Sequence, residues 1–100
     1  MPGSISIGMA KAGLVAFARS IAREYGPYGI TANVVSPGMV ESELSSRMPA
    51  EQKQRITSMT PLGCIAQPGD IARAIAFFAS DDSGFTTGTY MPVNGGISME

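Results

Sequence analysis

Apolar residues recur at spacings of three and four from Gly8 to Tyr25, which predicts an amphipathic helix over this range. Gly26 and Pro27 follow directly, and this pair is typical of a helix end. The residues before the helix, Met1 to Ser6, are mostly small or polar and are expected to be a loop or a cut end. The predicted apolar face consists of Leu14, Phe17, Ala18, Ile21 and Tyr25.

A run rich in β-branched residues, Ile30 to Val35, predicts a buried strand of about six residues. Pro37 cannot donate to a sheet ladder, so the strand is expected to stop there. Ligands of open α/β sheets bind just beyond the carboxyl ends of the strands. The loop at Pro37 and Gly38 is therefore the first candidate for a binding site, and a plain turn is the alternative.

The second half of the chain alternates short helical patterns with loops. Glu41 to Arg47 favours a helical turn or two, and a second short helix is expected to Ser58 with Pro49 at its first position. Residues 60 to 67 are expected to form a loop. A helix then starts at Pro68 and ends before Ser80. Its predicted buried side consists of Ile71, Ala72, Ala74, Ile75, Phe78 and Ala79.

The last element is a strand predicted from Thr89 to Val93, with a turn at residues 94–96. A strand, a helical connection and a second strand imply two parallel strands joined by a right-handed crossover. Parallel sheets normally contain more strands and are covered on both faces. The sequence therefore predicts an α/β fold, namely the C-terminal flank of a Rossmann-like, doubly wound parallel sheet.

Composition narrows the function. Seven basic against eight acidic residues give a net charge of −1, which offers no field for nucleic acid or an anionic membrane. With no histidine and a single cysteine, neither a His-based triad nor a structural zinc site is expected. Cys64 is expected to be a small apolar filler. No signal peptide or membrane span is predicted, so we expect a cytoplasmic protein in a reducing compartment.

Six segments, in order and in register, resemble the C-terminal part of a short-chain dehydrogenase/reductase, most like the 3-oxoacyl-acyl-carrier-protein reductase group. The likeness covers essentially the whole chain. The segments are Met9–Leu14, Tyr25–Asn33, Ser36–Ser42, Pro61–Gly63, Gln67–Ala72 and Gly88–Gly96.

The resemblance implies an NAD(P)-dependent oxidoreductase that reduces a carbonyl or oxidises an alcohol. Lys11 matches the Lys of the family's Tyr-x-x-x-Lys motif, where it holds the nicotinamide ribose and lowers the pKa of the catalytic Tyr. Pro37, Gly38 and Val40 would present backbone to the nicotinamide, and Ser42, where the family often has Thr, would bond the cofactor through its hydroxyl. Residues 39 to 60 would form a mobile substrate lid.

The chain departs from the family pattern in two ways. The position four before Lys11 is Ile7 instead of Tyr, and the longer spacing of related enoyl reductases reaches Ser4. Tyr25, Tyr28 and Tyr90 are expected to be poor substitutes. The sequence also contains no Gly-rich phosphate loop, which holds the pyrophosphate in such folds.

We therefore expect residues 1–100 to form a single partial Rossmann-like domain without the N-terminal cofactor-binding half. Such a chain would bind NADP or NAD weakly and have little activity alone. The alternative is a non-catalytic module that self-associates or complements a missing half, through an exposed strand edge and an exposed helix face. The resemblance also implies a homo-oligomer. Substrate and cofactor preference stay open, because the segment that selects NAD or NADP lies near the second strand of such folds.

Overall fold

A long helix, α1 (Pro2–Tyr25), opens the fold in a computed structural model that describes residues 2–98, with side chains from residue 9 onward. The expected loop at the start is therefore wrong for residues 2–6, and Met1 lies outside the described residues. Proline is tolerated in a first helical turn because its missing N–H would have no partner there. The predicted end is confirmed, since a 3-10 turn, η1 (Gly26–Tyr28), follows Tyr25 directly.

Two parallel strands, β1 (Val34–Pro37) and β2 (Tyr90–Val93), form the sheet. The prediction of a strand over residues 30–35 is wrong at both ends. The N–H groups of Val34 and Gly38 point to β2, so the nitrogen of Pro37 faces the other edge and no ladder bond is lost. Just before β1, the Asn33 side chain takes the place of backbone hydrogen bonds between this segment and the residues that lead into β2. Its Oδ1 accepts from the Thr89 N–H at 3.0 Å and its Nδ2 donates to the Thr86 carbonyl at 3.2 Å.

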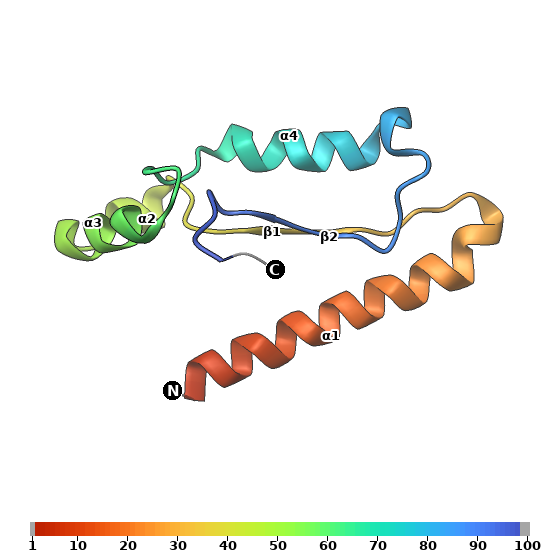
Figure 1. Cartoon of the computed structure of the whole chain (residues 1–100), viewed down its shortest axis with the longest axis horizontal. Helices are drawn as coiled ribbons and strands as arrows, with labels where there is room; N and C mark the ends of the chain where they lie inside the picture. The colour runs from red at the N-terminus through yellow and green to blue at the C-terminus, as the bar shows by residue number, and fades with distance from the viewer. Residues whose placement is uncertain (1, 99–100) are drawn as a thin grey trace.

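The helices cover the sheet on two sides and at one end (Figure 1). One face of the strand pair lies beneath α4 and the other faces α1, while α2 and α3 lie beyond the carboxyl ends of both strands. This arrangement confirms the predicted α/β flank with a parallel strand pair. The remaining elements are α2 (Glu43–Ser46), α3 (Ala50–Met59), α4 (Pro68–Ala79) and the 3-10 turn η2 (Asp81–Ser83).

Local chemistry explains the helix starts. Pro68 opens α4, as predicted, and the Asp70 carboxylate accepts the backbone N–H of Gln67 at 2.8 Å. That bond satisfies one of the donors that every helix N-terminus leaves unpaired. In α3 the predicted role of Pro49 is wrong by one position, because Pro49 is the N-cap and Ala50 is the first helical residue.

The core is small. Among the described residues, the buried apolar side chains are Ala18, Ala22 and Val34. The predicted buried side of α4 is only partly confirmed: Ile71, Ala74 and Phe78 are half-buried, whereas Ala72, Ile75 and Ala79 are exposed. On the predicted apolar face of α1, Leu14, Phe17 and Tyr25 are also exposed. A sheet of two strands is too narrow to cover both helices, so apolar surface remains open.

No helix within residues 2–98 is both long enough and apolar enough to cross a membrane.

Candidate functional site

The Pro-Gly loop at the end of β1 is held closely against the end of β2. The Gly38 N–H donates to the Val93 carbonyl at 3.2 Å. A Cβ at Gly38 would lie 2.7 Å from the Cβ of Asn94 and 3.1 Å from its Cα. Neither atom is the end of a flexible side chain, so only glycine fits here without a shift of the backbone.

Beyond Gly38, one isolated bridge pairs Val40 with Ala66, in the loop before α4. The Ala66 N–H donates to the Met39 carbonyl at 3.0 Å, and the Glu41 N–H donates to the Ala66 carbonyl at 2.7 Å. In this parallel geometry the N–H and C=O of Val40 point away from Ala66. Neither group has a partner within residues 2–98. A donor and an acceptor thus lie side by side on one residue, an arrangement that suits an amide.

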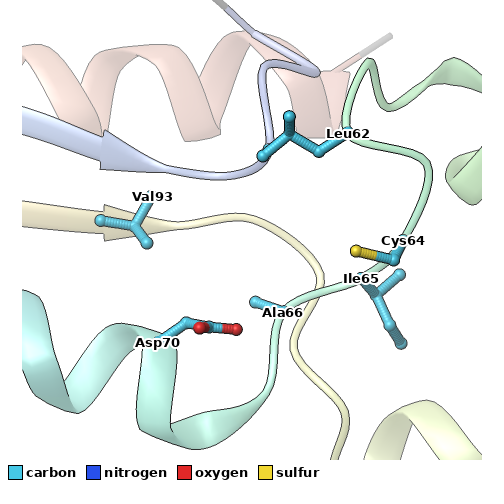
Figure 2. Close-up of a pocket in the computed structure, with 7 residues that line it drawn as sticks. Leu62, Cys64, Ile65, Ala66, Asp70 and Val93 are labelled. Carbon is cyan, nitrogen blue, oxygen red and sulfur yellow. The ribbon is translucent and has the colours of Figure 1, made fainter.

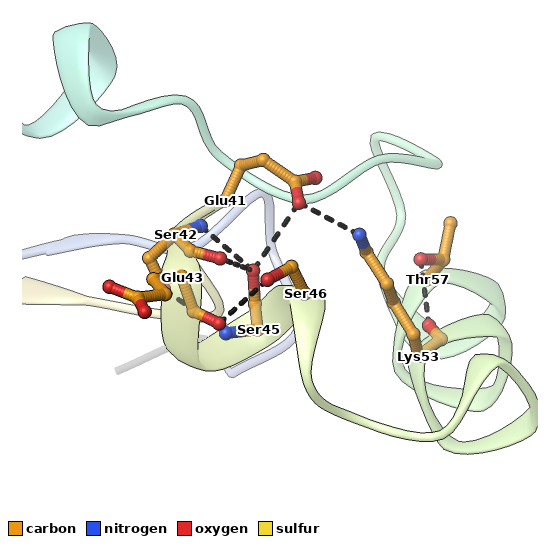
Figure 3. Close-up of polar contacts among 7 residues, drawn as sticks. All are labelled: Glu41, Ser42, Glu43, Ser45, Ser46, Lys53 and Thr57. Carbon is orange, nitrogen blue, oxygen red and sulfur yellow. Dashed lines mark hydrogen bonds and ion pairs between the residues drawn. The ribbon is translucent and has the colours of Figure 1, made fainter.

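Ser42 is the N-cap of α2, as Figure 3 shows. Its Oγ accepts the Ser45 N–H at 3.2 Å, and the Ser45 Oγ accepts the Ser42 N–H at 2.8 Å. This reciprocal pair satisfies two backbone donors at the helix start. The Ser42 hydroxyl proton is not used by that cap, so the side chain keeps a donor that a ligand can use.

Glu41 joins the Pro-Gly loop to α3. Its Oε1 accepts from the Lys53 Nζ at 2.8 Å and from the buried Ser45 hydroxyl at 3.3 Å (Figure 3). The hydrogen bond from Lys53 is the main reason that the pKa of Glu41 lies below its ordinary value. The carboxylate therefore stays charged and holds the first residues after the loop to α3.

A cavity of about 370 Å³ lies beside the Val40–Ala66 bridge, between the start of α4 and the end of β2 (Figure 2). Its walls are mainly apolar, and Asp70 is its one charged residue. The Asp70 pKa is lowered, mainly by the hydrogen bond from the Gln67 N–H and further by Arg73. Cys64 lines the cavity and is exposed, so its expected role as a packed filler is wrong. The other lining residues are Leu62, Ile65, Ala66, Val93 and Gly95.

Lys11 lies apart from the loop residues along the sheet. Its Nζ sits 4.9 Å from the ring centre of Tyr90, which pairs with Val34 at the start of the strand pair. Pro37 pairs with Val93 three residues further on, or roughly 10 Å along the strands. The structure thus brings Pro37, Gly38, Val40 and Ser42 together at the carboxyl end and places Lys11 over the Tyr90 ring.

Three contacts of the candidate site were not predicted from the sequence: Ala66 beside Val40, Lys53 on Glu41, and Tyr90 under Lys11. Each joins residues from separate elements, so spacing carries no signal for them. For the contact between Lys11 and Tyr90, the one available signal was residue type, since a cation and an aromatic ring attract each other. Ile7, where the family pattern has Tyr, lies one turn before Lys11 in α1, and its side chain is outside the described residues.

A parallel strand pair between two helices, with a Pro-Gly loop at its carboxyl end, is the arrangement of a flank of a Rossmann-like α/β sheet. The family model described as enoyl-(acyl carrier protein) reductase matches residues 1–98. The chain belongs to this family of short-chain dehydrogenases/reductases, and it corresponds to the C-terminal portion of 3-oxoacyl-acyl-carrier-protein reductases.

Curated relatives agree with this assignment. The chain is 46% identical to the 3-oxoacyl-(acyl-carrier-protein) reductase of Haemophilus influenzae over 98% of this chain and 40% of the relative. The reductase of Pseudomonas aeruginosa is 39% identical, over 97% of this chain and 39% of the relative. A (3R)-3-hydroxyacyl-CoA dehydrogenase of Mus musculus is 39% identical, over 97% and 38%. The chain therefore spans about two fifths of the length of these relatives.

Proposed function

We propose that this chain is the C-terminal part of an NAD(P)-dependent oxidoreductase that interconverts a carbonyl and a hydroxyl group, with a 3-oxoacyl or 3-hydroxyacyl compound as substrate. The substrate class comes from the names of the Haemophilus influenzae and Mus musculus relatives. Because the chain spans only two fifths of these relatives, we expect weak cofactor binding and little turnover from the chain alone.

The observation that carries the proposal is the unpaired backbone of Val40. Its N–H and C=O face away from Ala66, at the carboxyl end of the strand pair. A nicotinamide carries a carboxamide with one acceptor and two donors, which matches this pair of groups. Gly38 allows a close approach at the same loop. The cofactor, when bound, would supply or accept the hydride.

Two side chains would add to the site. The Ser42 hydroxyl would donate to the cofactor while its oxygen continues to cap α2. Lys11 would act as the catalytic lysine, binding hydroxyl oxygens of the ribose through its ammonium. The segment after the loop, α2 and α3, would serve as the lid over the substrate, held by the Glu41–Lys53 ion pair.

A thermal unfolding scan with and without millimolar NADPH tests the proposal. A ligand that binds only the native state at ten times its Kd raises the free energy of unfolding by about 1.4 kcal/mol. Backbone amide NMR of the same samples should show the largest shifts at Gly38, Val40 and Glu41. No rise in the transition and no shift at these amides at saturating NADPH would contradict the proposal.

A matched pair of variants isolates the Val40 backbone. Val40→Pro removes the unpaired N–H but keeps both bridge bonds, which use Met39 and Glu41. Loss of one hydrogen bond should weaken NADPH binding by about two- to tenfold. Val40→Ala shortens the side chain and keeps the N–H, so its NADPH affinity should remain within about twofold of the original chain.

The second candidate is an interaction module, and a specific groove favours it. The groove has a volume of about 430 Å³ and lies between α1 and α4, against residues 31–34 at the start of β1. Among the described residues, β1 pairs with β2 and leaves its other edge open. Leu14, Phe17 and Ile75 on its walls are each more than half exposed, at 53%, 63% and 54%. An edge with apolar walls fits a further parallel strand, and we propose one from the part of the family fold that the match does not cover.

Sedimentation velocity tests this second function. A run on the chain alone detects self-association. A run on its mixture with the N-terminal three fifths of the Haemophilus influenzae reductase detects complementation. Phe17→Glu, in the groove, should abolish association. Phe85→Glu, at a fully exposed site that does not line the groove, should leave association intact. A folded monomer at all concentrations, with or without the added piece, would rule out the module.

A further inference from the structure

The Tyr90 ring and the Lys11 ammonium come from opposite ends of the chain and meet at the sheet. Tyr90 is the first residue of β2, and Lys11 lies in the first half of α1. The Nζ atom lies 4.9 Å from the ring centre, within the range at which a cation is attracted to the negative face of an aromatic ring. Both residues are half-buried, which keeps part of the water away from the pair.

We propose that Tyr90 is a positioning residue that holds the Lys11 ammonium against the sheet before any ligand binds. This inference rests on the proposed function for the role of Lys11 as a cofactor ligand. Ordering a lysine side chain carries a cost in rotamer entropy. A ring that orders Lys11 in advance removes part of that cost from ligand binding.

The geometry allows the ring and a ligand to share the ammonium. An ammonium has three N–H donors, and a ring face attracts the cation from one side. The contact with Tyr90 therefore does not itself compete with a hydroxyl or carbonyl oxygen for the N–H donors of Lys11. In this role Tyr90 does not replace the tyrosine that the family pattern places at Ile7, because the contact uses the ring face and not the phenolic oxygen.

NMR of the chain labelled with ε-¹³C lysine gives a direct test. The sequence has two lysines, Lys11 and Lys53, so two Cε–Hε signals are expected. The Tyr90 ring current should shift the Lys11 Hε protons upfield of Lys53, which contacts Glu41 and serves as the internal reference. Tyr90→Phe keeps the ring face and should keep the shift. Tyr90→Leu should move the Lys11 signal to the Lys53 position.

Binding provides the functional test. Loss of a cation–π contact of about 0.5–1 kcal/mol corresponds to NADPH binding that is weaker by up to about two- to fivefold in Tyr90→Leu, with Tyr90→Phe close to the original affinity. If the Lys11 Hε shift is the same in Tyr90→Leu as in the original chain, the inference is wrong, whether or not NADPH binds. If the signal shifts as expected and NADPH does not bind, only the proposed function fails. Should Tyr90→Leu not fold, the comparison of Lys11 with Lys53 in the original chain and in Tyr90→Phe decides.

Discussion

The Lys53 ammonium donates to the Glu41 carboxylate at 2.8 Å, and this contact joins α3 to the end of the Pro-Gly loop. Glu41 follows Val40 directly, so the ion pair also fixes the residue whose backbone groups we assign to the cofactor. α3 and the Pro-Gly loop are therefore mechanically connected. A change in one should be detectable in the other.

The first prediction concerns acid stability. The pKa of Glu41 is lowered from about 4.5 in the folded chain, so its contribution to stability is present above about pH 4.5 and is lost as the pH falls through the folded pKa. In Lys53→Gln, the free energy of unfolding measured by urea titration should therefore fall less steeply as the pH is lowered from about 6 to about 3. Arg47→Gln, in an exposed pair with Glu43, matches the loss of one positive charge. The same pH dependence of the free energy of unfolding in both variants would contradict the role of Lys53.

The second prediction concerns the close contact at Gly38. Gly38→Ala places a Cβ 2.7 Å from the Asn94 Cβ, so the loop or the turn after β2 must move. Such overpacking typically costs about 1–3 kcal/mol in the free energy of unfolding, measured by urea titration. Gly13→Ala is the matched control, because nothing lies within 4 Å of its added methyl group in α1. That variant should gain up to about 1 kcal/mol. A cost below about 0.5 kcal/mol at Gly38 would mean that the turn adapts freely.

The third prediction concerns the side chain that replaces the ladder before β1. Asn33→Ala leaves the Thr89 N–H and the Thr86 carbonyl without their partner. Because both are partly buried, we expect a loss of about 2 kcal/mol and faster hydrogen exchange at Thr89. Asn94→Ala makes the same substitution in the closing turn, where a smaller cost of about 0.5–1 kcal/mol is expected. Unchanged exchange at Thr89 would show that Asn33 does not hold the strands in register.

These contacts show which parts of the structure were predictable from the sequence. The start of α4 at Pro68 and the position of β2 depend on neighbouring residues, so local patterns predicted them. The inclusion of Pro37 in β1 was missed because it depends on which edge of the strand is paired. The exposure of Ile75 was missed for a related reason, since a helical pattern shows an apolar face but not whether a strand is there to cover it.

The candidate site divides in the same way. Pro37, Gly38, Val40 and Ser42 are close in sequence, and their grouping at the carboxyl end of the sheet was predicted from the position of the loop. The contact between Lys11 and the Tyr90 ring was not predicted, because it depends on how α1 packs against a strand from the other end of the chain. Sequence spacing contains no information on such a contact.

The last prediction separates two roles of Ser42. Ser42→Ala removes the N-cap of α2 and leaves the Ser45 N–H unpaired, which should cost about 1 kcal/mol. Ser42→Asp keeps an oxygen that caps the helix but lacks the hydroxyl donor, so stability should stay near the original value while NADPH binding weakens. Ser42→Thr keeps both cap and hydroxyl and should retain both properties. Thermal unfolding with and without NADPH measures stability and binding in one experiment. If Ser42→Asp binds NADPH as well as Ser42→Thr does, the hydroxyl serves only as the helix cap, and the cofactor proposal rests on the loop backbone and Lys11.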